Sequence, residues 1–286
     1  MLRYLFILLF LASLLCGCSV VRPASKVAMG EASLKRGDYT AAKQAFDEAL
    51  RYRPNDPRLA LIIARAWVSH KRWREAAEVL EKVARRSQDA SLYSMLGLCY
   101  HNLNDLDRAE EAYLQALRLR PDDPLVLNNL GYMWADQGRN LRTAVKMLEK
   151  AHQLAPNEAF IMDSLGWAYY RQALEDLKSG RERQAEKLLN AARDLVEKAV
   201  DRSPGEAEQH YHLGMIYASL GYERDAEAEL RRALAVNPKL NKAKDALDSL
   251  GSIPRLAPSN PRNPLRGANL HADMHAQMVG IKFWGG

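Results

Sequence analysis

The residues best suited to chemistry in this chain of 286 residues are a few histidines and cysteines. His271 and His275 stand four residues apart, a spacing that on a helix would place two imidazoles on one face, as a metal site can require. Their surroundings carry no helical pattern, so we interpret the pair as tail composition and predict no metal site. His210 and His212 would point to different sides of one helix, and we expect surface and packing roles for them.

No catalytic centre is predicted from the remaining residues. Cys99 has no His or Asp set near it in the sequence, and it is expected to be a small buried residue rather than a nucleophile. The sequence contains no His-Glu-x-x-His, Gly-x-Ser-x-Gly or CxxC motif and no phosphate-binding glycine loop. We therefore predict that the protein is not an enzyme and uses no cofactor. A small hydrolase is the alternative that a broad activity screen would test.

The first 18 residues have the pattern of an export signal. A positive start at Arg3 is followed by twelve mostly apolar residues, 4–15, and then by Cys16, Gly17 and Cys18. A membrane span needs about 20 apolar residues, so this stretch is too short to be one and is typical of a signal peptide. One interpretation is an ordinary cleaved signal in which Cys18 is an idle thiol.

The run from Leu15 to Cys18 also resembles the bacterial lipobox, with Cys16 at a position where Ala or Ser is commoner. The resemblance implies that residues 1–17 are a lipoprotein signal peptide and that Cys18 is acylated. Residues 18–22 would then form a lipid-anchored linker. Ser19 in place of Asp implies transfer to the periplasmic face of a bacterial outer membrane.

The charge balance argues against a nucleic-acid partner. The formal net charge is +6, but both signs alternate along the predicted helical faces and no run of Lys or Arg exceeds two residues. A nucleic-acid surface normally needs clustered basic residues. We interpret the charges as a solvated surface.

The elements that position any site are helical hairpins, because one pattern recurs through most of the chain. Leu130, Gly131 and Trp134 recur 35 residues later as Leu165, Gly166 and Tyr169. Gly131 would let the second helix of the hairpin come close to the first. This pattern, which is followed by spaced alanines and a closing proline, resembles the tetratricopeptide repeat. Six copies are predicted, over residues 23–56, 57–89, 90–123, 124–158, 159–206 and 207–240.

The resemblance implies an all-α fold, a right-handed superhelical solenoid of about six helical hairpins. In the fifth copy the closing residues arrive 14 residues late, which predicts a hairpin extended by two turns in each helix. Residues 241–250 read as a capping helix that completes a repeat domain over 23–250. Residues 251–286 carry four prolines and little periodicity, so a disordered tail is predicted there.

The same resemblance implies that a partner segment binds in the concave groove formed by the first helices. Transferring the inward-facing positions of the family to this sequence brings five aromatic residues and several polar ones to one side. The predicted groove residues are Asn128, Tyr132, Asp136, Phe160, Asp163, Trp167, Tyr170, Arg171 and Tyr211. Aromatic residues at helical spacing are also common in cores, so packing is the alternative role for each of them.

The whole chain is thus similar in plan to bacterial tetratricopeptide lipoproteins of the outer membrane, including those associated with pilus assembly and secretins. This implies a non-enzymatic scaffold or adaptor that is anchored by its N-terminal lipid and binds protein partners of the cell envelope. The expected roles are in pilus, secretion or envelope assembly. The alternative is a component of glycan or polysaccharide handling that binds polymer along the groove. The sequence leaves a homo-oligomer open.

Overall fold

The computed structural model describes residues 23–256, and every element within that range is a helix, which confirms the all-α prediction. Six helical hairpins are followed by one further helix, as the repeat pattern predicts. The predicted signal peptide, Cys18 and the linker lie outside the described residues. The predicted disordered tail lies outside them from residue 257 onward.

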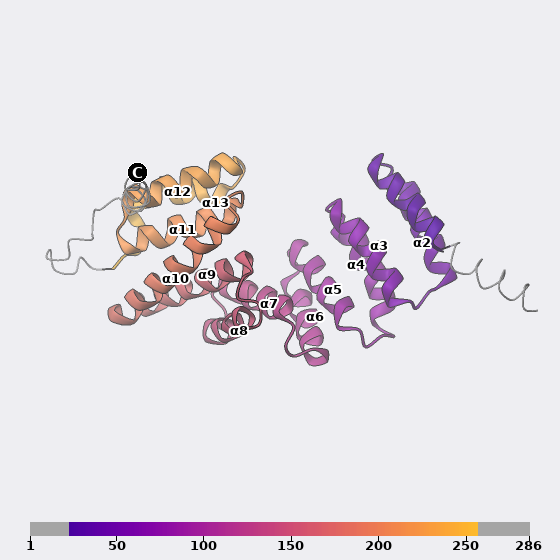
Figure 1. Ribbon diagram of the computed structural model, residues 1–286, viewed down its shortest axis with the longest axis horizontal. Helices are drawn as coiled ribbons and strands as arrows, with labels where there is room; N and C mark the ends of the chain where they lie inside the picture. The colour runs from indigo at the N-terminus through magenta and orange to yellow at the C-terminus, as the bar shows by residue number, and fades with distance from the viewer. Residues whose placement is uncertain (1–22, 257–286) are drawn as a thin grey trace, which may run out of the picture. The chain divides into compact units, whose positions relative to one another are not determined.

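The chain divides into two compact units, with the division between Val126 and Leu127. The sequence predicts one continuous repeat domain. In a stack of repeats each hairpin contacts only its neighbours, so a division close to the start of the fourth hairpin needs no break in the repeat pattern. The helices of unit 1 (Figure 1) cover residues 23–35, α2 Tyr39–Tyr52, α3 Pro57–Ser69, α4 Trp73–Ala84, α5 Ala90–Asn102 and α6 Leu106–Leu119.

Helix α7, Pro124–Asp136, contains the division and lies mostly in unit 2. The other helices of unit 2 are α8 Leu141–Leu154, α9 Ala159–Lys178, α10 Glu182–Arg202, α11 Ala207–Leu220, α12 Glu223–Val236 and α13 Asn241–Asp248. Helices α9 and α10 have 20 and 21 residues, against 14 in α11 and in α12, so the fifth hairpin is extended as the late closing residues predict.

Local sequence signals account for where the helices begin. The Asp56 carboxylate accepts hydrogen bonds from the backbone N–H groups of Arg58 and Leu59, and Pro57 occupies the first turn, where its missing N–H costs nothing. Asp38 and Asp105 cap α2 and α6 in the same way. These caps satisfy N–H groups that have no partner inside the helix.

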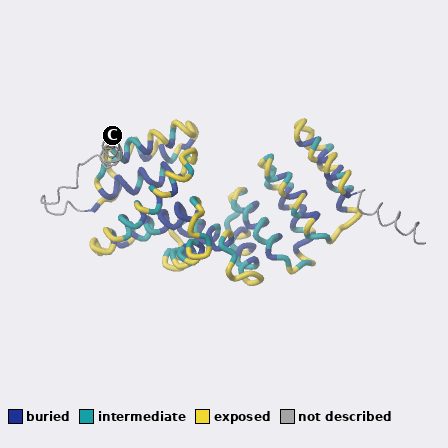
Figure 2. Tube along the Cα trace, viewed as in Figure 1, coloured by how far each residue is buried: buried dark blue, intermediate teal, exposed yellow. Residues whose placement is uncertain are grey.

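The hairpins close because small residues stand where the two helices touch. A Cβ atom built on Gly131 would lie 2.8 Å from Cγ of Leu148, and one on Gly166 would lie 2.4 Å from Cγ2 of Val196. Any larger residue would push the second helix outward. Buried residues follow the helix sides that face neighbours, and exposed residues gather at turns and helix ends (Figure 2). Each unit therefore has its core between its own helices.

The packed part of the chain continues beyond the predicted end of the repeat domain at residue 250. A short 3₁₀ helix, Leu250–Ser252, leads to Ile253 and Leu256, which are both buried against the core of unit 2. The N–H of Leu256 donates to the carbonyl of Ser219 on α11 at 3.0 Å, and the Ser219 hydroxyl donates to the carbonyl of Pro254 at 2.7 Å. The predicted tail, 251–286, therefore begins too early. Its first residues, 251–256, are held on α11 by two buried apolar side chains and two hydrogen bonds.

Candidate partner-binding site

Five ring side chains from three helices of unit 2 meet in what we call the aromatic cluster: Tyr132, Trp167, Tyr170, Tyr211 and His212. The Trp167 ring lies between two others. It stacks on Tyr170 with centroids 4.9 Å apart and on His212 with centroids 4.2 Å apart. Such offset and tilted contacts between rings are favourable beyond the area that they bury. The cluster therefore holds α7, α9 and α11 together from within.

One ring of the cluster, His212, has a buried ion-pair geometry with Asp163. Nδ1 of His212 lies 2.9 Å and 3.1 Å from the two carboxylate oxygens of Asp163, and the His212 side chain is 1% exposed. Its other nitrogen, Nε2, is buried without a hydrogen-bond partner among the described residues. We assign the ring proton to Nδ1, because that nitrogen alone faces an acceptor.

Asp136, at the end of α7, connects this cluster to the solvent. Its carboxylate accepts a hydrogen bond from Nε1 of Trp167 at 3.2 Å, and its backbone carbonyl accepts one from the Arg171 guanidinium. The same guanidinium lies 5.8 Å from the centre of the Trp167 ring, within the range of a cation–π contact. Asp136 and Arg171 thus close the outer edge of the aromatic cluster.

The predicted groove residues separate into buried and accessible sets. Trp167 and Tyr170 are 3% and 1% exposed, so the packing alternative applies to them, and burial raises the pKa of Tyr170 to about 12. Asn128 and Asp163, expected to lie open in the groove, are 5% and 7% exposed. Asp163 tolerates burial because His212 binds its carboxylate. Tyr132, Arg171 and Tyr211 are half-buried, whereas Asp136 and Phe160 are exposed.

The accessible side of this region is a hollow of about 590 Å³ at the N-terminal ends of α9 and α11, which we call the acidic hollow. Phe160, with 41% of its surface exposed, lies on its wall, and Asp163 forms part of its lining. The other lining residues are Asn157, Glu158, Ala159, Arg202, Ser203, Glu206, Glu208 and Gln209.

The charge of this hollow is negative. Glu158 and Glu206 are exposed and form no ion pair among the described residues, whereas Glu208 is paired with Lys242. The single cation in the lining, Arg202, donates to the backbone carbonyl of Asn157 at 2.8 Å rather than to a carboxylate. Two carboxylates beside an exposed aromatic ring are therefore free to meet a positively charged ligand.

A second buried histidine pair joins α11 to α12. Nδ1 of His210 lies 2.6 Å from Oε2 of Glu229, and Nε2 lies 3.0 Å from the backbone carbonyl of Pro204. Both partners accept hydrogen bonds, so this geometry stabilises the doubly protonated, cationic form of His210. The hydrogen bond that His210 donates to Glu229 raises the pKa of His210.

Sequence reasoning missed the partners of both histidines and expected surface as well as packing roles for them. Both side chains are buried, and each pairs with a carboxylate of a different helix. The sequence carried a signal for one of these pairs. Asp163 and His212 both stand near the start of the first helix of their repeat, and the two repeats are adjacent, so these polar side chains can face each other. Glu158 and Glu206 were missed because they precede those helices.

The structure shows the environment of the other residues considered for chemistry. Cys99 is fully buried, as predicted, and burial raises the pKa of its thiol to about 12, so it stays protonated at neutral pH. Between residues 23 and 256 no group of three or more His, Cys, Asp or Glu residues is arranged to hold a metal ion. None of the helices in that range has the length and apolar character needed to cross a bilayer. His271 and His275 lie outside the described residues.

Comparison with known proteins identifies the repeats. Family models described as tetratricopeptide repeat match residues 33–98, 90–123 and 207–240. A TPR repeat-containing protein of Pseudomonas aeruginosa is 30% identical over 183 residues, which are 63% of this chain and 28% of that protein. Cellulose synthase operon protein C of Xanthomonas axonopodis pv. citri is 36% identical over 132 residues, 46% of this chain and 8% of that protein.

Among solved structures, the Cut9–Hcn1 hetero-tetramer of the APC/C contains a chain that superposes with a TM-score of 0.61 at 21% identity, over 80% of this chain and 42% of that one. This likeness shows the fold alone. The chain spans less than a third of the length of either of the two bacterial relatives. These matches place tetratricopeptide repeats over residues 33–123 and 207–240, and such repeats suggest a scaffold for protein–protein interaction.

Proposed function

We propose that this protein is a non-enzymatic adaptor that binds a segment of a partner protein at the acidic hollow of unit 2. The segment would carry a Lys or Arg side chain next to an apolar one. Its cation would meet Glu158 and Glu206, and its apolar side chain would pack on Phe160. This replaces the aromatic groove of the sequence prediction with a site whose groups are accessible.

The observation that carries the proposal is the exposure of Phe160 beside carboxylates without cation partners. An aromatic ring with 41% of its surface in water gains free energy when a partner covers it. The unpaired carboxylates add selectivity for a basic segment, because a like-charged segment would be repelled. The aromatic cluster beneath holds α9 and α11 in place, so the hollow is formed before the partner arrives.

The leader residues support a proposal for where this binding takes place. An acylated Cys18 would anchor the protein at the periplasmic face of an outer membrane, and the partners would be proteins of the cell envelope, in pilus, secretion or envelope assembly. Confinement at a surface raises the effective concentration of adaptor and partner for each other. The anchor and the hollow are separate parts of the proposal, and each can be tested without the other.

A crosslinked pull-down from cell envelopes tests the hollow. The test variant combines Phe160→Ala, Glu158→Gln and Glu206→Gln. The control variant combines Leu154→Ala, Glu182→Gln and Glu186→Gln, which remove an exposed apolar side chain and two exposed carboxylates elsewhere in unit 2. We expect one protein to be lost from the test variant and retained by the control. Its bound segment, made as a peptide, should bind the unmodified chain and not the test variant.

The glycan alternative depended on Trp and Tyr faces that could stack on sugars. Trp167 and Tyr170 offer no free face in this structure, so no observation favours it over a protein partner. A saccharide that competes with the peptide for the hollow would reverse this preference.

A further inference from the structure

Unit 1 has a hollow of its own, of about 830 Å³, between the C-terminal parts of α2 and α4. Its basic residues are Arg51, Lys82, Arg85 and Arg86, and we call it the basic hollow. Three carboxylates also line it, on Asp47, Glu78 and Glu81. The charge that the hollow offers to a ligand therefore depends on which of these side chains are already paired with one another.

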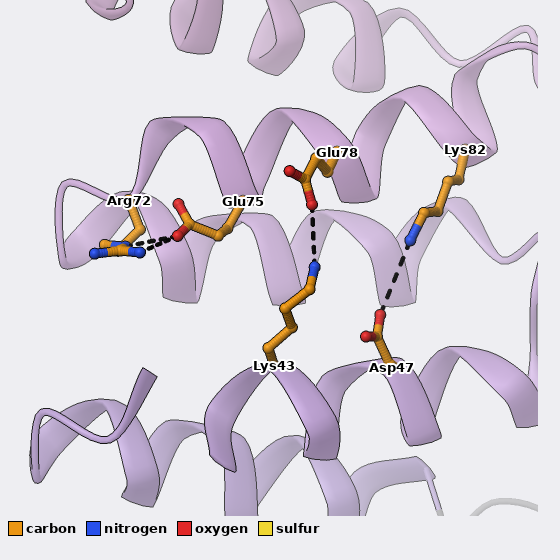
Figure 3. A network of polar contacts seen from close by, with 6 residues as sticks. All are labelled: Lys43, Asp47, Arg72, Glu75, Glu78 and Lys82. Carbon is orange, nitrogen blue, oxygen red and sulfur yellow. Dashed lines mark hydrogen bonds and ion pairs between the residues drawn. The ribbon is translucent and has the colours of Figure 1, made fainter. Parts of the chain in front are cut away.

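The carboxylates are all engaged. Lys43 Nζ lies 3.0 Å from Glu78, and Lys82 Nζ lies 3.9 Å from Asp47, so the two lysines bridge α2 and α4 (Figure 3). Glu81 accepts a hydrogen bond from the Tyr100 hydroxyl at 2.5 Å and lies 3.8 Å from Arg108.

The three arginines of the hollow are not engaged in this way. Arg51, Arg85 and Arg86 are exposed and make no ion pair with the carboxylates of the described residues. The hollow thus presents three free guanidinium groups, which bind phosphate groups well because their N–H donors form a planar fork.

The basic hollow lies at the end of unit 1 where the described chain begins. An ion pair of 2.5 Å joins Lys26, near the start of the first helix, to Glu48, near the end of α2, so α2 ends beside that start. The connection of residues 53–56 is short, so α3 begins there too, and its hairpin partner α4 returns to the same end. Arg51, Arg85 and Arg86 consequently share this end with Pro23.

We propose that the basic hollow docks on the anionic headgroups of the membrane in which the protein is anchored. This rests on the proposed acylation of Cys18, from which Pro23 can be at most about 17 Å away along the chain. The free guanidinium groups would then lie within reach of lipid phosphates, to which basic residues near a membrane surface are attracted. Tyr52, with 47% of its surface exposed next to Arg51, suits the interface between headgroups and water.

The test uses residues 19–286, which retain every described helix but carry no lipid, so any binding comes from the protein surface. Sedimentation is measured with vesicles of phosphatidylcholine alone and with vesicles that also contain phosphatidylglycerol. We expect binding to the anionic vesicles only. The variant Arg51→Gln, Arg85→Gln, Arg86→Gln should bind roughly tenfold or more weakly. A control with the same charge change, Arg142→Gln, Lys146→Gln, Arg183→Gln, alters three exposed basic residues of unit 2 and should bind within about threefold of the unmodified chain.

Equal loss in both variants would mean that net charge alone causes the binding, and that would overturn the proposal. Binding that ignores phosphatidylglycerol, or no binding at all, would overturn it as well. The anchor is tested separately by the mass of the mature N-terminal peptide from cell envelopes. An unmodified Cys18 would refute the anchor, whereas the vesicle experiment would still report on the basic hollow.

Discussion

His212, on α11, donates its Nδ1 proton to the carboxylate of Asp163, on α9, at 2.9 Å, although the two residues are 49 positions apart. Asp163 also lines the acidic hollow, so one side chain belongs both to the core and to the wall of the proposed site. The pair lies between the fifth and sixth hairpins, whose first helices are α9 and α11. The position of the hollow relative to these helices is therefore fixed by a buried polar contact.

Removing the carboxylate of this pair should destabilise unit 2. Asp163→Ala leaves His212 buried with both ring nitrogens lacking partners, which we expect to lower the free energy of unfolding by about 2–3 kcal/mol. Urea denaturation followed by circular dichroism measures the change. Asp194→Ala, which removes an exposed carboxylate of α10, serves as the control and should change stability by less than about 0.5 kcal/mol. Equal effects of the two variants would contradict this account of the pair.

The His210–Glu229 pair predicts how stability depends on pH. The pKa of His210 is raised in the folded protein by its hydrogen bond to Glu229, so the folded state holds this proton more tightly than the unfolded state does. The stabilisation of the folded state by the His210 proton is complete below the ordinary histidine pKa of about 6.5. It is lost as pH rises through the higher folded-state pKa. The difference in unfolding free energy between the unmodified chain and His210→Gln should therefore shrink as pH increases above 6.5. A difference that grows with pH would show that His210 is not a cation in the folded state.

The close contact at Gly166 predicts a sharp size limit in the fifth hairpin. Gly166→Ala places a methyl group 2.4 Å from Cγ2 of Val196 and 3.0 Å from a backbone carbonyl, so about 1–3 kcal/mol of stability should be lost. Gly205→Ala is the matched control, because nothing lies within 4 Å of the added atom. Thermal unfolding of the two variants distinguishes them. If both melted alike, α9 and α10 would not be packed as closely as the structure has them.

Two aromatic residues of the predicted groove should behave in opposite ways. Trp167→Ala removes a ring enclosed between Tyr170 and His212 and should cost about 3–5 kcal/mol of stability. Phe160→Ala removes an exposed ring and should change stability by about 0.5 kcal/mol or less while weakening partner binding. Measured together, stability and binding separate packing from recognition. A stable Trp167→Ala variant with impaired binding would restore the aromatic groove as the site.

The fold could be predicted because the repeat pattern occurs six times in the sequence. Residues such as Gly131 and Leu148 meet within one hairpin, and their spacing in the sequence is enough to place them. The extension of the fifth hairpin was predictable for the same reason, since its added residues keep the helical phase.

The site could be predicted only in part, because its character depends on contacts between hairpins. The positions of Trp167 and Tyr170 in the repeat suggest a groove. Their spacing in the sequence does not show that His212, on the first helix of the following hairpin, covers the Trp167 ring. Phe160 lies two residues into its helix, at the rim, and stays exposed. Glu158 and Glu206 lie just before helices and belong to no repeated pattern, so only the structure brings them together.

The acidic hollow is tested most directly by site-specific photocrosslinking in intact cell envelopes. A photoreactive phenylalanine analogue at position 160 should form a crosslink to one partner protein, at a peptide that contains Lys or Arg, and this product should decrease when Glu158→Gln and Glu206→Gln are added. The same analogue at Leu154, which is exposed to a similar extent on α8, should not give that product. Crosslinking from both positions alike, or a product indifferent to the two carboxylates, would contradict partner capture at the acidic hollow.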